Sequence, residues 1–517
     1  MLHPFYSGSR IHKISGPKPK GLLGNIKELS DHEPTTVYQR WVEDHGHILG
    51  VNTLLFFYML YLADPRAVAH VLAHHVDYPM HKDVRKEAER VLGEGKARFL
   101  SPAFGPYQIR ELQSIFYDKC SELCELWIQR IKSENTTRNP ADTASVWVEA
   151  TSWLNKMTLD VVGLAGFNSS FDSLNPDGMP NELSEALRAM LAVNGNPSVL
   201  DYLHAFLPIT RIIPSQSRRK VDHARKVMDR IGRELIADAK SATRATASGD
   251  ISRKNFAAKD LLSLLVRANM ASDVPDSSRL SDEEVLAQIP TFLFAGHETT
   301  SSALACFLFS IACNPEVQDR LRAEAFACAE GDRPTAEALN KLPYLDSVVR
   351  ETLRLYAPVS AMLRTVTKDD IIPTESRWID NEGVEHSGIP VVAGDSIIIP
   401  ILAMNRSKAI WGDDAYEFKP ERWTDLPATA SSIPGVWGSS MTFSGGLRAC
   451  IGYRFAIAQM KATAYTLIRT FRFALAVDPA QIEISVNAMT RPVIRGKAKE
   501  GPNLPLWVGL VESESAL

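Results

Sequence analysis

A glycine-rich stretch near the C-terminus, residues 443–452, combines residue types that could hold a flat and charged cofactor. It reads Phe-Ser-Gly-Gly-Leu-Arg-Ala-Cys-Ile-Gly and precedes a helical pattern. Gly445 and Gly446 permit positive φ and carry no Cβ, so the chain could lie flat against a large planar group. Cys450 stands before the amides of the next helix, which favour a thiolate. Arg448 could meet a carboxylate of the same group. The stretch therefore predicts thiolate ligation of a planar cofactor.

The same stretch resembles the haem-binding loop of the cytochromes P450, in which thiolate donation favours O–O cleavage. The resemblance implies that Cys450 is the metal ligand and that Phe443, Gly446, Arg448 and Gly452 belong to the haem site. Five fixed residue types at fixed spacing should recur by chance in on the order of one sequence in ten thousand. The alternative is a buried free cysteine in a helix-entry turn, the usual environment of an isolated cysteine.

A second candidate is a polar island, residues 295–300, inside a long apolar helix pattern. The pattern starts with a capping box at Ser281 and stops at Asn314-Pro315. Pro290 should bend this helix without breaking it. The island reads Ala-Gly-His-Glu-Thr-Thr, which is unusual for a helix that would otherwise be buried.

Two interpretations of the island remain. In the first, it is a kinked core helix with satisfied polar residues. In the second, Gly296 admits a flat ligand, and the Thr299 hydroxyl bonds back to a carbonyl, opens the helix and admits water. The island is similar to the acid–alcohol pair of the P450 distal helix. That resemblance implies that Thr299 stabilises the proton network around dioxygen and that Glu298 relays protons from solvent.

Three further charged residues are assigned to structure. Glu351 and Arg354 stand at i,i+3, a weak signal that composition alone predicts about once per chain. Arg422 lies in Pro-Glu-Arg-Trp further along the chain. The P450 resemblance implies that it joins the pair in a buried network behind the cysteine loop. Removing one partner of such a network would strand a buried charge.

The remaining site residues follow from the resemblance alone. Arg364 would point at a haem propionate, and the alternative is a solvated loop arginine. The residues implied to line the substrate cavity are Phe292, Phe294, Ala295, Ala361, Met362 and Met489. They indicate an apolar substrate and no more.

One stretch departs from the family pattern. After Gly93-Glu-Gly95 the family carries an aromatic residue or histidine and then an arginine, on a helix that clamps a haem propionate. Here the chain runs almost directly to Pro102, and Arg98 is the nearby candidate for the lost cation. We therefore expect weakened haem retention.

Composition excludes several classes of protein. The chain has 517 residues, and a hydrophobic content of 45% is ample for a large core. The net charge of −4 argues against a nucleic-acid partner. Six cysteines without disulfide-framework spacing indicate a reducing compartment. The longest apolar run, residues 54–63, is about half of the roughly 20 residues that a membrane span needs, and residues 54–62 are interpreted as paired buried strands.

The predicted architecture is the mainly α cytochrome P450 fold with a small β region. A hinge-like segment, residues 1–34, precedes a single haem domain at residues 35–517. Eukaryotic members usually carry a membrane helix before such a hinge, and we expect no anchor here. Helices are predicted at 65–72, 147–165, 181–193, 218–239, 281–314 and 449–468, a small sheet within 371–400, a hairpin tip at 485–490 and a polar link at 240–256.

The resemblance is to the eukaryotic microsomal, fungal-like type, with haem b as the cofactor. It implies monooxygenation of an apolar terpenoid, fatty acid, steroid or aromatic molecule in secondary metabolism. Electrons would come from NADPH through a separate NADPH–cytochrome P450 reductase, with cytochrome b5 as an optional partner. The location would be the cytosolic face of the endoplasmic reticulum, or the cytoplasm without an anchor. Two alternatives are a P450-type isomerase or dehydratase, against which Glu298 and Thr299 argue, and a silent haem protein, which the departure after Gly95 favours.

A peripheral membrane contact is also predicted. Residues 205–214 are apolar and bracketed by prolines, and the basic run Arg218-Arg219-Lys220 follows them. Apolar side chains beside cations suit an anionic lipid surface. The alternative is an ordinary buried loop. The apolar contacts would be Phe206, Leu207, Ile209, Ile212 and Ile213.

Overall fold

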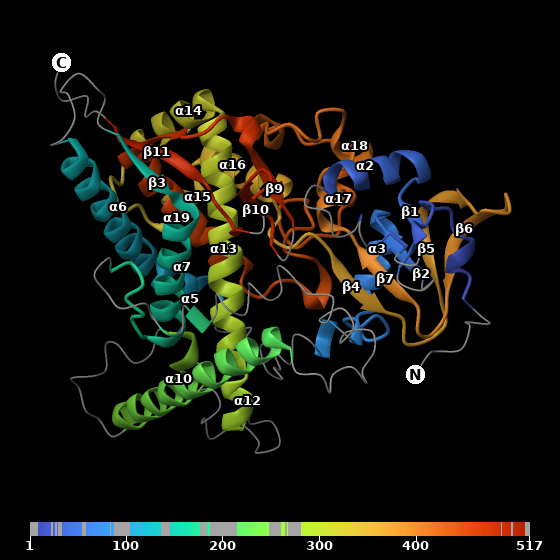
Figure 1. Ribbon diagram of the computed structural model, residues 1–517, viewed down its shortest axis with the longest axis horizontal. Helices are drawn as coiled ribbons and strands as arrows, with labels where there is room; N and C mark the ends of the chain where they lie inside the picture. Colours follow the sequence, from blue (N-terminus) through green and yellow to red (C-terminus); the bar gives the residue numbers. More distant parts are fainter. Residues whose placement is uncertain are drawn as a thin grey trace. The chain divides into compact units, whose positions relative to one another are not determined.

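A computed structural model describes most of the chain (Figure 1). The described residues are 9–21, 24–25, 28, 34–53, 58–82, 84–86, 104–135, 145–175, 182, 185–186, 215–247, 260–263, 266, 281–486, 489–497 and 500–511. They fall into two compact units, each assembled from separate parts of the sequence. The first comprises Met1–Lys86, Arg350–Cys450 and Ile484–Arg491, and the second Glu87–Val349, Ile451–Glu483 and Pro492–Leu517.

The first unit contains a four-stranded sheet in the order β1-β2-β7-β4. β1 (Ile48–Asn52) pairs antiparallel with β2 (Tyr58–Leu62). β7 (Ser396–Ile399) runs parallel to β2 and antiparallel to β4 (Met362–Thr365). A strand pair was predicted within residues 54–62; the structure describes residues 58–62 of that stretch, and they form β2. The first strand of the pair precedes it, because Ile48 to Val51 supply a second apolar run.

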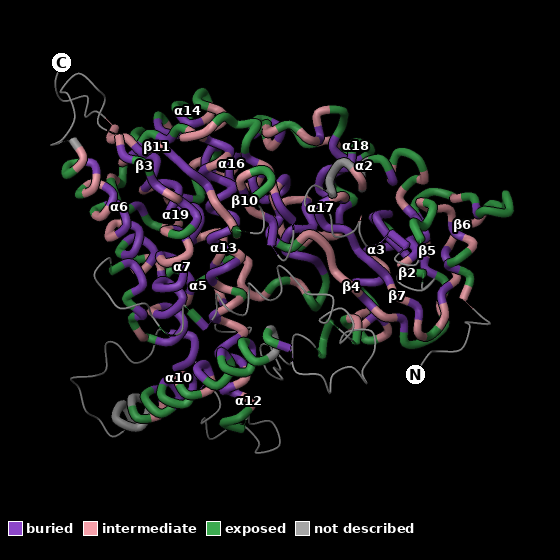
Figure 2. Tube along the Cα trace, in the orientation of Figure 1, coloured by how far each residue is buried: buried purple, intermediate pink, exposed green. Residues whose placement is uncertain are grey.

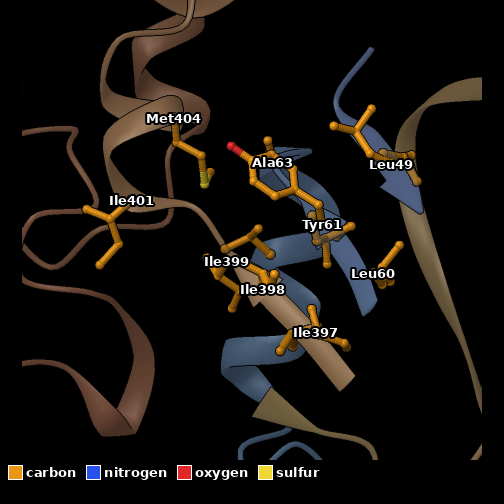
Figure 3. Close-up of a cluster of buried hydrophobic side chains, with 14 of the residues drawn as sticks. Leu49, Leu60, Tyr61, Ala63, Ile397, Ile398, Ile399, Ile401 and Met404 are labelled. Atoms are coloured by element: carbon orange, nitrogen blue, oxygen red, sulfur yellow. The ribbon is translucent and has the colours of Figure 1, made fainter. Parts of the chain in front are cut away.

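The core of the first unit lies on this sheet (Figure 3). All five residues of β1 are buried. Consecutive strand residues point to opposite faces, so both faces of β1 are covered. Leu60 and Tyr61 of β2 and Ile397 and Ile399 of β7 are fully buried in the same cluster. Met404 joins them from the helix that follows β7.

Short elements complete the first unit. The Asp64 carboxylate accepts from the Ala67 amide at 2.9 Å and begins the helix that was predicted there. The remaining elements are η1 (Ile11–Lys13), α2 (Pro34–His45), α3 (Pro65–Ala73), β5 (Asp370–Ile379) paired with β6 (Glu385–Val391), α17 (Ile401–Asn405), α18 (Lys408–Trp411), η8 (Pro420–Trp423), η9 (Ala428–Ser432) and η10 (Gly446–Arg448). The unit boundary falls within α16 (Pro343–Leu355).

The second unit is mainly helical. Its helix α7 lies alongside α13 (Figure 1), and both are largely buried (Figure 2). Its helices are α5 (Pro106–Glu111), α6 (Gln113–Asn135), α7 (Ala150–Phe167), α10 (Gln216–Ala247), α12 (Asp282–Leu286), α13 (Gln288–Cys313), α14 (Pro315–Phe326), α15 (Ala336–Asn340) and α19 (Tyr453–Thr470), with η11 (Pro479–Gln481). β3 (Ser145–Glu149), β11 (Pro505–Leu510) and β8 (Phe471–Leu475) form an antiparallel sheet. The unit boundary crosses β9 (Ile482–Ser485) and β10 (Arg491–Ile494), which form a two-stranded sheet around the predicted hairpin tip.

Two predicted boundaries were wrong. The helix predicted at 147–165 begins at Ala150, because residues 145–149 pair with β11 as a strand and the Glu149 carboxylate then caps α7. Residues 240–247 of the predicted polar link continue α10, whose buried and exposed positions alternate with helical period. Of the helix predicted at 181–193, only residues 182, 185 and 186 are described, and they are helical.

The long helix pattern before Asn314 becomes two helices. The predicted capping box is present: the Ser281 hydroxyl accepts from the Glu284 amide at 3.1 Å, and the Glu284 carboxylate accepts from the Ser281 amide at 2.9 Å. A turn at Ala287 separates α12 from α13. Pro290 has no N–H to donate to the Leu286 carbonyl, which explains a break at this point.

The mainly α fold with a small β region is confirmed. In the part of the chain that the structure describes, no helix combines the length and apolar character needed to cross a membrane.

Candidate functional site

The cysteine loop of the first unit is closed by its own backbone. The Cys450 amide donates to the Phe443 carbonyl at 2.8 Å, and η10 lies between the two residues. The buried Phe443 ring packs edge-on against Trp437, with ring centroids 5.7 Å apart. Cys450 itself is exposed, so the alternative of a buried core thiol does not fit.

The glycines of this loop are required by the protein's own packing. Gly446 has a φ of +66°, whereas Gly445 is extended at −145°. A Cβ at Gly445 would lie 1.8 Å from the Pro434 carbonyl oxygen, and one at Gly446 would lie 2.9 Å from that of Leu72. Both glycines are therefore needed for packing inside the protein, and the expectation that they also face a flat ligand stays a prediction. At Gly452 a Cβ would meet only ordinary contact distances, the nearest 3.8 Å from Phe104.

Two arginines of the first unit have no anionic partner among the described residues. Arg364 lies in β4 with 7% exposure, which excludes a solvated loop arginine. Its one described polar contact is with the Met362 sulfur, at 3.8 Å. Burial lowers the pKa of Arg364, and the charge of the neighbouring Arg448 lowers it further. Arg448 is exposed at the end of η10. An anionic ligand would relieve both effects, so the residues present fit a cofactor that carries carboxylates.

Glu351, Arg354 and Arg422 form a buried network, and none of the three is more than 6% exposed. Arg354 donates through Nε and Nη2 to the Glu351 carboxylate, both at 2.9 Å. Arg422 Nε donates to the same carboxylate at 2.8 Å. Two further groups donate to the Glu351 carboxylate, the Trp423 indole and the Lys419 amide, each at 3.0 Å. Every charge in this network therefore has several partners.

Asn405 connects this network to the cysteine loop, and the sequence reasoning missed it. Arg354 Nη1 donates to the Asn405 carbonyl at 2.8 Å. The Asn405 side chain accepts from the Met441 amide at 2.7 Å and donates to the Thr442 hydroxyl at 2.9 Å. Asn405 is fully buried, and Phe443 follows Thr442 in the chain. The available signal was an amide side chain directly after an apolar run, residues 397–404.

The polar island of the second unit lies inside α13, which continues through it. The Glu298 carboxylate is 3% exposed, accepts from Asn155 Nδ2 at 2.9 Å and lies 3.2 Å from His297 Nε2. The Thr299 hydroxyl donates to the Ala295 carbonyl at 2.6 Å. Glu298 is thus placed among protein groups of α7 and α13, and Asn155 is a further member that the sequence did not reveal. The proton-relay roles of Glu298 and Thr299 stay predictions.

Gly296 has a packing role in the structure. A Cβ there would lie 2.9 Å from Cγ2 of Val162 on α7. The missing side chain of Gly296 therefore lets α7 and α13 pack closely, and the expectation that Gly296 also admits a flat ligand stays a prediction.

The residues expected to line the substrate cavity are divided between the two units. In the second unit, Phe292 and Phe294 are partly exposed, Ala295 is exposed, and the Phe292 ring lies 5.9 Å from that of Phe104. In the first unit, Ala361 and Met362 are partly buried and Met489 is buried. The Thr490 amide donates to the Pro358 carbonyl at 2.9 Å, which brings Met489 close to the segment before β4.

Some predicted features lie outside the described residues. They are the departure from the family pattern at residues 93–102, with Arg98, and the apolar segment 206–213. Of the basic run after that segment, Arg219 and Lys220 are exposed on α10. The expectations about haem retention and membrane contact therefore stay predictions.

Comparisons with known proteins find similarity along nearly the whole chain. The sequence profile described as cytochrome P450 matches residues 14–494. The chain is 43% identical over 513 residues to cytochrome P450 monooxygenase 205 of Postia placenta, with 97% of this chain and 93% of that relative covered. It is 42% identical to cytochrome P450 monooxygenase 128 of the same fungus, covering 98% and 94%. A ganoderic acid synthetase of Ganoderma lucidum is 29% identical, covering 93% and 91%. The chain therefore belongs to the cytochrome P450 family, and it is an enzyme of the monooxygenase class.

Proposed function

We propose that this protein binds haem b through Cys450 and inserts one oxygen atom of O2 into an apolar small molecule. The observation that carries the proposal is the combination of an exposed cysteine with two arginines, Arg364 and Arg448, that have no anionic partner among the described residues. A thiolate ligand and cations for two carboxylates are what proximal haem ligation requires.

The proposal assigns separate roles to the residues that hold the haem and to the residues that handle protons. Cys450 would supply the thiolate ligand, and Arg364 and Arg448 would bind the propionates. Bound haem supplies the activation of dioxygen. The Thr299 hydroxyl, held on the Ala295 carbonyl, and the buried Glu298 carboxyl group beside Asn155 would pass protons from solvent towards the site where dioxygen is activated.

The substrate is an apolar molecule of terpenoid, fatty-acid, steroid or aromatic type in secondary metabolism. The aromatic and aliphatic residues Phe292, Phe294, Ala361 and Met489 support this class. One relative is named for the synthesis of an organic acid, which supports a small organic substrate. Electrons come from NADPH through a separate reductase, with cytochrome b5 as an optional partner, at the cytosolic face of the endoplasmic reticulum.

The absorbance of the reduced, CO-bound protein tests the ligand. We expect the Soret band typical of thiolate ligation in the wild type and its loss in Cys450→Ala. Cys328→Ala is the matched control, because Cys328 is a partly exposed free cysteine on another segment and should leave the band unchanged. A band that persists without Cys450 would refute the assignment.

Turnover with a reductase separates the rival classes of reaction. A monooxygenase consumes NADPH in proportion to hydroxylated product. An isomerase or dehydratase of this family would convert substrate without NADPH, and a silent haem protein would form no product.

A further inference from the structure

The Glu298 carboxyl group lies between a histidine of its own helix and an asparagine of the neighbouring helix. Its Oε1 is 3.2 Å from Nε2 of His297 and accepts a hydrogen bond from Asn155 Nδ2 at 2.9 Å. Asn155 belongs to α7, which lies alongside α13 (Figure 1). His297 is 1% exposed and Glu298 is 3% exposed. Two ionisable groups therefore meet at a place that is closed to bulk solvent.

A hydrogen bond to the backbone fixes the protonation of one nitrogen of the His297 ring. Nδ1 lies 2.5 Å from the Leu293 carbonyl oxygen, which can only accept a hydrogen bond. Nδ1 must therefore carry a hydrogen. In a neutral ring with this tautomer, Nε2 is an acceptor. The nitrogen that faces Glu298 is thus the one whose protonation is left to the contact with the carboxyl group.

Only one proton count satisfies both sides of this contact. A neutral ring beside an ionised carboxylate would place two acceptors 3.2 Å apart in a buried site, where unsatisfied acceptors cost free energy. A charged ring beside a neutral carboxyl group would bury a net positive charge, which is also unfavourable. A single proton, on Nε2 or on the carboxyl group, makes the contact a hydrogen bond and leaves the pair without net charge. The Asn155 amide can donate to Oε1 in either case.

The charged side chains of the elements packed against α13 have other partners. On α7, Asp160 accepts from the amides of Ser173 and Leu174, and Lys156 lies 5.1 Å from the centroid of the Trp153 ring. These charges are therefore accommodated without His297 or Glu298. The same holds for the following described ion pairs of α10, α12, α14 and α19: Arg230 with Glu234, Lys240 with Asp282, Arg322 with Asp319, Lys461 with Asp346, and Arg469 with Asp332.

We propose that His297 and Glu298 share one proton, and that His297 is a positioning residue that keeps this proton beside Glu298. The use of the proton rests on the proposed function, in which Glu298 is a proton carrier. In the transfer, the Nε2–H bond of His297 breaks and an O–H bond forms on the Glu298 carboxyl group. That group then releases the proton towards Thr299, and solvent returns a proton to Nε2. One proton enters and one leaves, so the pair regains its starting charge.

The proton count of the pair can be measured without turnover. The full-length holoprotein, reduced and CO-bound, is labelled with 15N in the histidine rings and with 13C in the glutamate carboxyl groups, and NMR at neutral pH reports the charge of each group. The signals of the pair are identified by their loss in His297→Gln and Glu298→Gln, and by the shift that each variant causes in the signal of the other residue. We expect a charged ring with an ionised carboxylate, or a neutral ring with a neutral carboxyl group. A neutral ring with an ionised carboxylate, or a charged ring with a neutral carboxyl group, would overturn the proposal.

Two substitutions of His297 separate a shared proton from a simple hydrogen-bond donor. His297→Gln retains an N–H that can donate to Glu298 but does not release its hydrogen, whereas His297→Leu has no donor. Both variants should lower the product formed per NADPH by about a hundredfold, the low end of the range for lost proton transfer. His223→Gln is the control, an exposed histidine on α10, and should leave the ratio unchanged. A normal ratio in His297→Gln with a low one in His297→Leu would show that the site needs only a donor, and would refute the shared proton.

A double variant tests whether His297 acts through Glu298. Glu298→Gln alone should lower the product formed per NADPH, and adding His297→Gln should lower it no further, because the histidine then has no carboxyl group to supply. Two losses that multiply would assign independent roles to the residues and overturn the positioning role. An unchanged ratio in Glu298→Gln, together with the expected proton count by NMR, would instead refute the proton-carrier role in the proposed function and confirm the shared proton alone.

Discussion

Two groups of buried arginines in the first unit differ in how their charge is balanced. Arg354 and Arg422 surround the Glu351 carboxylate, and Arg354 also donates to the carbonyls of Asn405 and Ala415. Arg364 is almost as deeply buried, yet the described residues offer it only a thioether, and Arg448 repels it. The paired charges of Arg354 and Arg422 lower the folding free energy only slightly less than neutral groups would, because each has a partner. The unpaired charge of Arg364 is unfavourable for folding, and an anionic ligand can offset it.

This difference separates structural charges from binding charges without reference to a family. Arg354, Arg422 and Arg364 are all buried in the same unit, and their partners distinguish them. It predicts that loss of a paired arginine damages the fold, while loss of an unpaired one damages ligand binding. The variants below test this distinction on the same protein.

The largest expected effect is that of Arg354→Met on folding. The substitution leaves the Glu351 carboxylate buried at 0% exposure with one of its two cations removed. Breaking a buried ion pair in this way costs about 3–5 kcal/mol of unfolding free energy. Urea unfolding of the haem-free protein measures it, and a loss below about 1 kcal/mol would show that Arg422 alone satisfies Glu351.

Arg364→Met should have the opposite pattern. It removes a buried charge without a described partner, so the unfolding free energy of the haem-free protein should stay constant or rise. Haem should instead bind about 10- to 150-fold more weakly, which corresponds to one charge-assisted hydrogen bond of about 1.5–3 kcal/mol. Transfer of haem to an apoprotein acceptor measures this. Haem content of the unmodified chain as purified tests in addition whether the shortened stretch after Gly95 has already weakened retention.

Much of this division was predictable from the sequence, and some was not. The resemblance to a family indicated that Glu351, Arg354 and Arg422 belong to one network, which the spacing of Glu351 and Arg354 alone would not have shown. It did not reveal Asn405. The Asn405 side chain accepts from the Met441 amide and donates to the Thr442 hydroxyl, and these bonds form only after the fold has brought residues 405 and 441 together.

The glycines show a second limit of sequence reasoning. A sequence shows where a Cβ is absent, but not what occupies its place. At Gly296 it is Val162, and at Gly446 it is the Leu72 carbonyl. The helix start at Ala150 was missed for a related reason, since the strand before it depends on pairing with residues 505–509, far along the chain.

The adjacent threonines of α13 provide a smaller test with a matched control. Thr299 and Thr300 each donate a hydroxyl hydrogen bond to the carbonyl four residues earlier, at 2.6 and 2.9 Å. Thr300 is buried and Thr299 partly exposed. Thr299→Ala should lower product formed per NADPH by about a hundredfold, the low end of the range for a lost proton-transfer group, and divert electrons to peroxide. Thr300→Ala should leave the ratio unchanged. Equal ratios in both variants would mean that the two hydroxyls only shape the helix.

The smallest expected effect concerns the acid stability of the paired group. Hydrogen bonds from Lys419 and Arg422 lower the pKa of Asp414 to about 2, from an ordinary value of 3.8. A carboxyl with a lowered folded-state pKa stabilises the fold fully above its unfolded pKa. That stabilisation is lost as the pH falls towards the folded value, because the unfolded state takes up the proton first. The unfolding free energy of the wild type should therefore exceed that of Asp414→Asn by about 1 kcal/mol near pH 6. The difference is modest because solvent screens a side chain that is 29% exposed.

The gap between wild type and Asp414→Asn should shrink as the pH falls from about 4 towards 2. Asp370 provides an independent comparison in the same unit. Its burial opposes ionisation, but hydrogen bonds from His70 and Tyr78 outweigh that effect and lower its pKa to about 2 as well. Asp370→Asn should show the same pH dependence, and the two effects should add in the double variant because the residues share no described partner. If the difference in unfolding free energy between wild type and Asp414→Asn stays constant with pH, the contribution of Asp414 comes from hydrogen-bond geometry instead of charge. Charge pairing would then not explain the stability that Asp414 adds beside Arg422.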